Sequence, residues 1–200
     1  MNIAVFASHG GSGLQAIIDA CRSKLINAKV CAVISNNSGS FALQRARDNG
    51  IPAFHFSQKT IADPIALEEA ILRALTGNNA HIIFLAGYLK KLGPTILKAF
   101  ENRIFNIHPS LLPKYGGKGM HGLNVHTAVL AAGETETGVT IHHVSDEYDK
   151  GGIIAQAKVP VLKGDTPEIL AARVLEYEQV FIVETLVKII DQSSKKRVLP

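Results

Sequence analysis

Short apolar runs alternate with longer amphipathic segments along the chain, and this order predicts parallel strands joined by helices. The apolar runs are nearly continuous, which is typical of strands buried on both faces of a sheet. The strands expected in the first half are Asn2–Ala7, Lys29–Ser35, Pro52–Phe56, His81–Ala86 and Arg103–Ile107. The helices expected between them are Ser12–Arg22, Phe41–Asn49, Pro64–Leu75 and Pro94–Phe100. The pattern predicts an α/β fold.

The pattern of glycine, apolar and polar residues changes after Pro113. A glycine-rich segment, residues 116–122, precedes an expected helix over Leu123–Ala132. Two alternating strands are expected at Gly138–Ser145 and Ile153–Leu162. Because a short connection rich in Asp and Gly joins them, they are predicted to pair antiparallel, which makes the sheet mixed.

A long helix is expected from Pro167 to about Ile190, with Asp165 or Thr166 as its N-cap. Residues 191–200 are expected to be a frayed tail. We find no internal repeat, linker or low-complexity tract, so residues 1–200 are expected to form a single domain.

Composition narrows the class of protein. The chain is 46% hydrophobic and 19% charged, which excludes a disordered protein. The net charge of +4 suits small anionic ligands better than a nucleic-acid groove, and no apolar run approaches the length of a membrane span. Cys21 and Cys31 fit neither a disulfide framework nor a CxxC metal site. The start of the chain reads as a strand rather than a signal peptide, so we expect a cytoplasmic protein.

The first chemical feature is the segment SHGGSG, residues 8–13, between the first strand and the first helix. Glycines there let backbone N–H groups point outward, and a helix N-terminus attracts anions, so a phosphate is the expected guest at Gly11, Ser12 and Gly13. The spacing matches neither a dinucleotide fingerprint nor a Walker A loop. A tight turn without any ligand is the competing interpretation.

The second feature is the pair Asn106 and His108 at the end of the fifth expected strand. Side chains two residues apart lie on one face, and open α/β sheets bind ligands at this edge. An amide donor beside an imidazole suits acyl transfer, because Asn106 can hydrogen-bond an oxyanion and His108 can add a second donor and relay protons. A purely structural histidine is the alternative.

The third feature is the loop DEYDKGG, residues 146–152, between the last two strands. Carboxylates in such loops usually cap turns, and spacing alone does not choose among Asp146, Glu147 and Asp149. Alternation places Thr140 and His142 on the same face of the preceding strand, where they can frame a polar pocket, and His143 on the other face.

A metal-dependent hydrolase is a competing interpretation, because several histidines lie near carboxylates. The spacing argues against it. His121 and His126 would lie far apart around a helix, and the adjacent His142 and His143 face opposite sides of their strand. No HExxH or similar chelating pair is present, so no metal is expected.

The motifs FNIHPSLLPKY (residues 105–115), LAGY (85–88) and DEYDKGG followed by IAQA (154–157) carry a family resemblance. From Met1 to about Ile190 the chain resembles the folate-dependent formyltransferase family, and within it the phosphoribosylglycinamide formyltransferases. The resemblance implies a Rossmann-like, three-layer fold with a mostly parallel sheet and an antiparallel C-terminal pair. It also implies formyl transfer from 10-formyltetrahydrofolate, as co-substrate, to the amine of glycinamide ribonucleotide in purine synthesis, without a metal.

The resemblance also assigns site residues. It selects Asp149 as the catalytic carboxylate beside Asn106 and His108, where Asn106 and a protonated His108 would stabilise the oxyanion and Asp149 would assist proton transfer. The acceptor site it implies comprises Gly11, Ser12, Gly13 and Glu178, with Lys118 available to the phosphate. The folate site it implies comprises Leu89, Lys90, Leu92, Thr140, His142 and Asp146. The chain departs from some relatives in carrying Gly10 and Gly13 where they have asparagine, and in the length of residues 116–122, which is expected to be a mobile flap.

Three alternatives follow from these expectations. A formyltetrahydrofolate hydrolase would use water in place of the amine. In a nucleotide-binding regulatory module, Asn106, His108 and Asp149 would have no function. Enzymes acting on larger acceptors such as methionyl-tRNA generally append a further domain, and ten residues after Ile190 are too few for one. We expect small-molecule partners only, and a monomer or homodimer.

Overall fold

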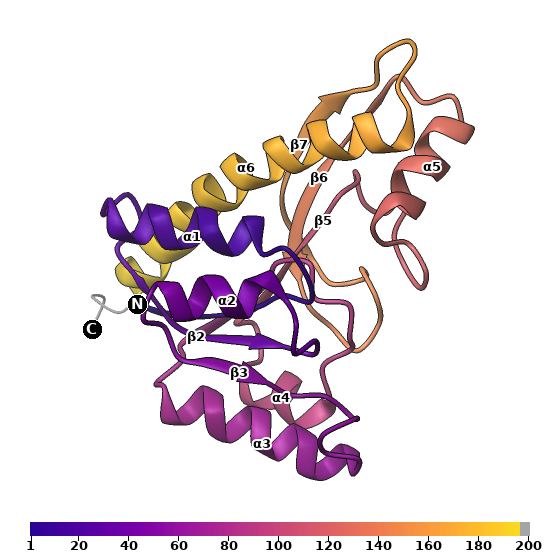
Figure 1. Cartoon of the computed structure of the whole chain (residues 1–200). Coiled ribbons are helices and arrows are strands. Elements are labelled where there is room, and N and C mark those ends of the chain that lie inside the picture. The colour runs from indigo at the N-terminus through magenta and orange to yellow at the C-terminus, as the bar shows by residue number, and fades with distance from the viewer. Residues whose placement is uncertain (197–200) are drawn as a thin grey trace.

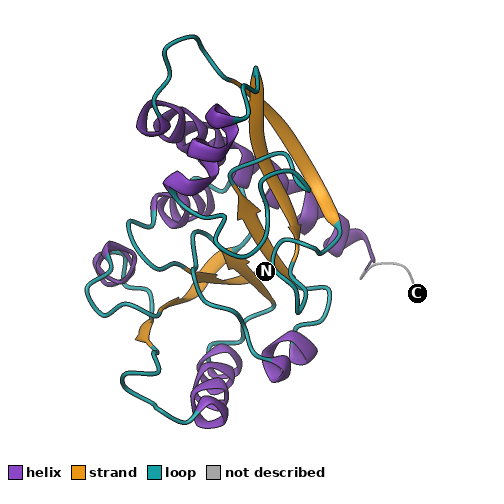
Figure 2. Cartoon of the chain, turned by 90° about the vertical axis from the view of Figure 1, so that its right-hand side faces the viewer, coloured by secondary structure: helices purple, strands orange, loops and turns teal. Residues whose placement is uncertain are grey.

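The computed structural model describes residues 1–196, which form one seven-stranded mixed sheet with helices on both faces (Figures 1 and 2). The strands lie in the order β3-β2-β1-β4-β5-β6-β7. Neighbours from β3 to β5 pair parallel, whereas β6 pairs antiparallel with both β5 and β7. The strands are β1 (Asn2–Phe6), β2 (Lys29–Ser35), β3 (Ala53–His55), β4 (Ile82–Leu85), β5 (Ile104–His108), β6 (Glu136–His143) and β7 (Ile153–Pro160). The predicted mixed α/β sheet is confirmed.

Six helices among the described residues make the two outer layers. One apolar cluster joins a face of the sheet to α1, α2, α5 and α6, and a second cluster joins the other face to α3 and α4. Successive residues of β1 alternate between the clusters, with Val5 in the first and Phe6 in the second. The helices are α1 (Ser12–Arg22), α2 (Phe41–Asp48), α3 (Pro64–Gly77), α4 (Pro94–Ala99), α5 (Leu123–Ala131) and α6 (Pro167–Lys196).

The final helix is longer than expected. Thr166 caps it, because its Oγ1 accepts from the backbone N–H of Ile169, while Asp165 instead accepts from Leu162 N and pairs with Arg173. The helix packs along α1 and on to β6 and β7 (Figure 1). It continues to Lys196, beyond the expected end at about Ile190. The expectation that residues 191–200 are frayed stays a prediction, and residues 197–200 lie outside the described residues.

Strand ends differ by a few residues from the expected ones in the antiparallel pair. Strand β6 begins at Glu136, two residues before Gly138, because Glu136 pairs with Pro160 across the ladder and its carboxylate lies 2.8 Å from Lys158 Nζ. Gly138 lies inside the strand, where a side chain would collide with the Ala157 carbonyl and Leu111. A glycine that permits close packing therefore resembled a strand boundary.

Candidate active site

A cleft of about 1030 Å³ opens at the carboxyl ends of β1, β4 and β5. The chain runs from β1 toward β2 on one side and returns to β4 on the other, so the cleft lies at the point where the strand order reverses. Residues from four segments line it, 9–13, 86–92, 117–122 and 144–149 without Asp146, together with one face of α6. No helix among the described residues is long and apolar enough to cross a bilayer.

The glycine-rich loop after β1 forms one end of the cleft. Gly11 has a left-handed backbone, φ 68°, and caps α1 without a side chain, so the first N–H groups of the helix are presented to the cleft. A side chain at Gly11 would press on Ala42 of α2, and one at Gly13 would press on Ile182 of α6. These two glycines therefore also serve packing, whereas Gly10 faces open space.

The loop is fastened to the neighbouring segment after β4. Ser8 N donates to the Gly87 carbonyl at 3.0 Å, and Ser8 Oγ accepts from Leu89 N at 2.9 Å. Leu89, Lys90 and Leu92 all line the cleft beside this junction. Across the mouth, Lys91 Nζ lies 5.8 Å from the ring centre of Tyr148, which connects this segment to the loop after β6.

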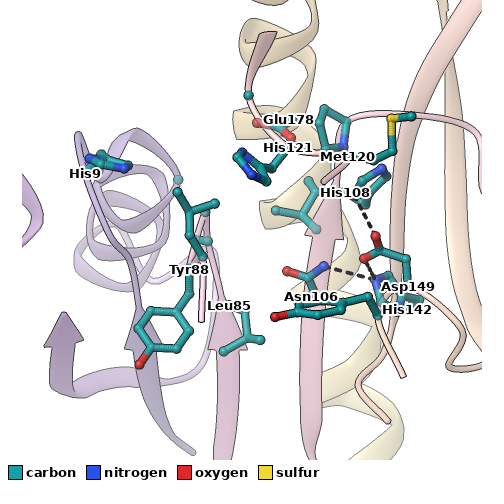
Figure 3. Close-up of a pocket in the computed structure, with 18 of the residues that line it drawn as sticks. His9, Leu85, Tyr88, Asn106, His108, Met120, His121, His142, Asp149 and Glu178 are labelled. Atoms are coloured by element: carbon teal, nitrogen blue, oxygen red, sulfur yellow. Dashed lines mark hydrogen bonds and ion pairs between the residues drawn. The ribbon is translucent and has the colours of Figure 1, made fainter. Parts of the chain in front are cut away.

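Asn106 lies on β5 directly opposite His142 of β6. Its Nδ2 lies 3.0 Å from Nε2 of His142, and because an amide nitrogen donates, Nε2 is the acceptor. The other ring nitrogen of His142 then carries the proton, which it donates to the His143 carbonyl at 2.8 Å. His142 thus fixes the Asn106 amide in the cleft lining (Figure 3), and the amide nitrogen has a second N–H beyond the one that faces His142.

His108 and Asp149 meet on the same wall of the cleft (Figure 3). His108 Nδ1 lies 3.5 Å from one carboxylate oxygen of Asp149, and His142 Nε2 lies 3.6 Å from the other. The second ring nitrogen of His108, Nε2, donates to the Tyr115 carbonyl at 2.8 Å. Both ring nitrogens therefore face protein groups, so the expected second hydrogen bond from His108 to an oxyanion does not fit this arrangement.

Burial and charge set the protonation of this pair. Burial lowers the pKa of His108, while Asp149 and the Tyr115 carbonyl oppose that effect, and the pKa lies below its usual value. Burial alone would raise the pKa of Asp149, but His142 and His108 in their protonated forms and the Gly117 N–H outweigh it, so the pKa lies below the usual range. At neutral pH the pair consists of a carboxylate beside an imidazole that is ready to accept a proton.

Two residues expected in the folate site lie elsewhere. Thr140 is fully buried outside the cleft lining, where its hydroxyl donates to the Ser110 carbonyl and accepts from Leu112 N and Gln156 Nε2. It holds the loop after β5 rather than a ligand. Asp146 is also absent from the cleft lining among the described residues, although its neighbours in the loop line it.

Glu178 of α6 and Lys118 of the glycine-rich segment, residues 116–122, also line the cleft. Burial raises the pKa of Glu178 to about 7, and the described residues supply no hydrogen bond or ion pair to its carboxylate. Among residues 1–196, no three His, Cys, Asp or Glu side chains are grouped so that they could share a metal ion.

Comparison with known proteins decides the family. The model of the family described as "Formyl transferase" matches residues 1–186. The chain belongs to the formyl transferase family.

Several named relatives of this family are similar to the chain. The chloroplastic phosphoribosylglycinamide formyltransferase of Vigna unguiculata is 44% identical over 92% of the chain, which spans 59% of that relative, or about three fifths of its length. The phosphoribosylglycinamide formyltransferase of Haemophilus influenzae is 43% identical over 88% of the chain and 81% of its own length.

Solved structures give the same picture of the fold. Glycinamide ribonucleotide transformylase 1 from Symbiobacterium toebii has a TM-score of 0.89 at 37% identity, with 96% of this chain and 88% of that chain covered. A formyltetrahydrofolate deformylase from Pseudomonas syringae has a TM-score of 0.85 at 22% identity, with 96% and 61% covered. The deformylase shares the fold, and at this identity the likeness extends no further.

Sequence reasoning missed several groups in this formyl transferase cleft. His126 of α5 and His121 line the cleft but were considered only as metal ligands, and His121 precedes the helix rather than lying in it. The Tyr115 carbonyl and the Gly117 N–H reach the His108–Asp149 pair through the backbone. Backbone groups have no residue signature, so only the glycines of residues 116–122 signalled this approach.

Proposed function

We propose that the protein transfers the formyl group of 10-formyltetrahydrofolate to the amine of glycinamide ribonucleotide, a step of purine synthesis. The observation that carries this proposal is the meeting of Asn106, His108 and Asp149 on one cleft wall, in a chain of the formyl transferase family. Names of similar proteins that specify phosphoribosylglycinamide as acceptor support the choice of substrate.

The proposed chemistry is direct attack by the amine. The amine nitrogen forms a bond to the formyl carbon, the bond from that carbon to the folate nitrogen breaks, and one amine proton ends on the departing nitrogen. The free N–H of Asn106 would stabilise the oxygen that becomes negative. His108 would take up the amine proton at Nδ1 beside Asp149, directly or through water, and then pass it to the departing folate nitrogen. While it is protonated, the charge of the imidazolium would favour the same oxyanion.

The two substrates are assigned to opposite ends of the cleft. The acceptor's phosphate would bind the N–H groups of Gly11, Ser12 and Gly13, with Lys118 nearby and Glu178 facing the ribose. The pterin would lie against Leu89, Lys90 and Leu92 and approach His142. Asn106 lines the same cleft as both groups of residues, as formyl transfer between the two substrates requires.

A formyltetrahydrofolate hydrolase is the second candidate, favoured by its shared fold alone. Incubation with 10-formyltetrahydrofolate, with and without glycinamide ribonucleotide, separates the candidates. Formyl loss that requires the ribonucleotide supports the transferase, formyl loss in water alone supports the hydrolase, and no loss under either condition contradicts both.

The setting of the protein is also part of the proposal. We place it in the cytoplasm, as a monomer or homodimer without a nucleic-acid partner. Both cysteines are free thiols, which suits a reducing compartment. Some plant relatives are named chloroplastic, so localisation of a tagged chain in its own cell is the direct test.

A further inference from the structure

The backbone of three consecutive residues, Tyr115 to Gly117, contacts both members of the His108–Asp149 pair. The Tyr115 carbonyl accepts from His108 Nε2 at 2.8 Å, and the Gly117 N–H donates to Asp149 Oδ2 at 2.8 Å. We call residues 115–117 the backbone clamp. It places the partial negative charge of a carbonyl oxygen next to the His108 ring and the partial positive charge of an N–H group next to the Asp149 carboxylate.

These two contacts favour one charge state of the pair. A carbonyl that accepts from an imidazole stabilises the protonated ring, and an N–H that donates to a carboxylate stabilises the ionised acid. Both effects oppose the burial of His108, which by itself favours the neutral ring. The backbone clamp therefore stabilises an imidazolium beside a carboxylate, which is the state that follows proton uptake in the proposed reaction.

The backbone clamp has a conformation that needs support. Tyr115 has φ 55° and Gly117 has φ 99°, both in the left-handed region that a tyrosine rarely adopts. A Cβ atom on Gly116 would collide with the Leu112 side chain and would lie 3.2 Å from Asp149 Cβ. Close packing on the catalytic carboxylate thus depends on a glycine at position 116 and on an anchor for Tyr115.

Glu134, which lies between α5 and β6, supplies that anchor from outside the cleft lining. Its Oε1 accepts from the Tyr115 hydroxyl at 2.9 Å and from Lys114 Nζ at 2.8 Å. The Lys114 side chain is 66% exposed, whereas Tyr115 is partly buried. Of these two donors, Tyr115 connects Glu134 to the His108–Asp149 pair, because the Tyr115 backbone carbonyl accepts from His108.

We propose that Tyr115 and Glu134 are positioning residues for formyl transfer, which hold the backbone clamp against His108 and Asp149 and so favour the protonated ring. The inference rests on the proposed function for its place in the reaction. Its test is a property of the free protein and needs neither substrate.

The charged and titratable groups that face His108 come from three elements. Asp149 approaches from the loop after β6, His142 from β6 itself, and His126 from α5. Asp149 raises the pKa of His108, whereas His142 lowers it, and repulsion from His108 contributes to the lowered pKa of His126. Variants outside this set, at Tyr115, Lys114 and Gly116, leave all of these groups in place.

The decisive test compares two variants, each of which removes one of the two hydrogen bonds that Glu134 Oε1 accepts. Tyr115→Phe removes the inner bond and Lys114→Gln the outer one, and the ring of His108 is titrated by NMR in each free protein, its signal assigned from a His108→Asn variant. Tyr115→Phe keeps the backbone carbonyl but removes its anchor to Glu134, so the bond from His108 to that carbonyl should weaken. The His108 pKa is expected to fall by about 0.5 to 1 unit, equivalent to about 0.7 to 1.4 kcal/mol. Lys114→Gln should leave it unchanged. An unchanged value in Tyr115→Phe, or an equal shift in both variants, would overturn the inference.

A second variant keeps the test independent of Tyr115. Gly116→Ala adds one methyl group against Asp149 and should lower the His108 pKa in the same direction, whereas Gly77→Ala adds the same group to open space at the end of α3. With both substrates, Tyr115→Phe and Gly116→Ala should reduce kcat and move its pH profile, with little change in either KM. A changed KM with an unmoved pH profile would contradict a positioning role. If formyl transfer itself is absent, the NMR titration still decides the inference.

Discussion

The burial of the Glu178 carboxyl group in the cleft wall leads to a prediction about how the stability of the protein depends on pH. Burial raises its pKa to about 7, against an ordinary value of 4.5, and the described residues offer its carboxylate no hydrogen bond. The folded state therefore prefers the protonated acid. The stability that Glu178 contributes is fully present below about pH 4.5 and is lost as the pH rises through about 7.

The size of this effect follows from the shift. A rise of about 2.5 units at 1.36 kcal/mol per unit gives an upper value of about 3.4 kcal/mol. Because the side chain is only partly shielded from solvent, we expect about 1 to 3 kcal/mol. Glu178→Gln keeps the shape and cannot ionise, so the variant should gain this much relative to the wild type between about pH 5 and about pH 8.

Urea unfolding of both proteins at the two pH values measures this difference. Glu176→Gln is the matched control, because Glu176 is an exposed carboxylate on the same helix and reports the general effect of removing one negative charge from α6. A stability difference between Glu178→Gln and the wild type that is the same at both pH values, or that is matched by the control, would refute the reasoning.

Three further predictions concern the proposed catalytic residues Asn106 and His108, the glycine-rich loop after β1, and the loop after β5. Asn106→Ala should lower kcat by about 100- to 1000-fold, the usual effect of losing one oxyanion donor, and His108→Ala should lower it at least as much. Thermal unfolding should show that both variants keep the fold, and retention of more than about a tenth of wild-type turnover would contradict the assigned roles. Gly10 faces open space, so Gly10→Asp should raise the KM of glycinamide ribonucleotide far more than that of the folate through repulsion of its phosphate, and Gly10→Asn, the uncharged match, should not; equal effects on both substrates would count against the phosphate site. Thr140→Val leaves the buried donors on Leu112 and Gln156 without this acceptor and should cost about 2 to 4 kcal/mol of stability in urea unfolding, whereas a neutral result would show that the hydroxyl is dispensable.

The order of strands and helices could be predicted because burial leaves a periodic record in the sequence. Strand β2 is buried at six of its seven positions, and its sequence is correspondingly apolar. Helix and strand ends were less accurate where tertiary contacts extend an element. Strand β6 gains two residues from pairing with β7. Such extensions depend on distant partners, which local patterns do not reveal.

The same difference between local patterns and distant contacts explains which residues of the candidate site could be predicted from the sequence. The placement of Asn106 and His108 on one face of β5 followed from alternation along a strand, and both line the cleft. Spacing could not choose Asp149 from the acidic residues of its loop, because the choice depends on how the loop folds back on β6, and only the family resemblance selected it. Thr140 had the right alternation but faces the loop after β5, since the sequence does not show how deeply a strand residue is covered.

The most direct test of the account follows the formyl carbon itself. 10-Formyltetrahydrofolate labelled with ¹³C in the formyl group is incubated with the protein, glycinamide ribonucleotide and methionyl-tRNA together at moderate salt, and the products are analysed by mass spectrometry. The account predicts that the label appears on the amine of the ribonucleotide, in amounts equal to the folate consumed, and that none is detected on the tRNA. Label recovered as formate, or on methionyl-tRNA at a comparable rate, would contradict it.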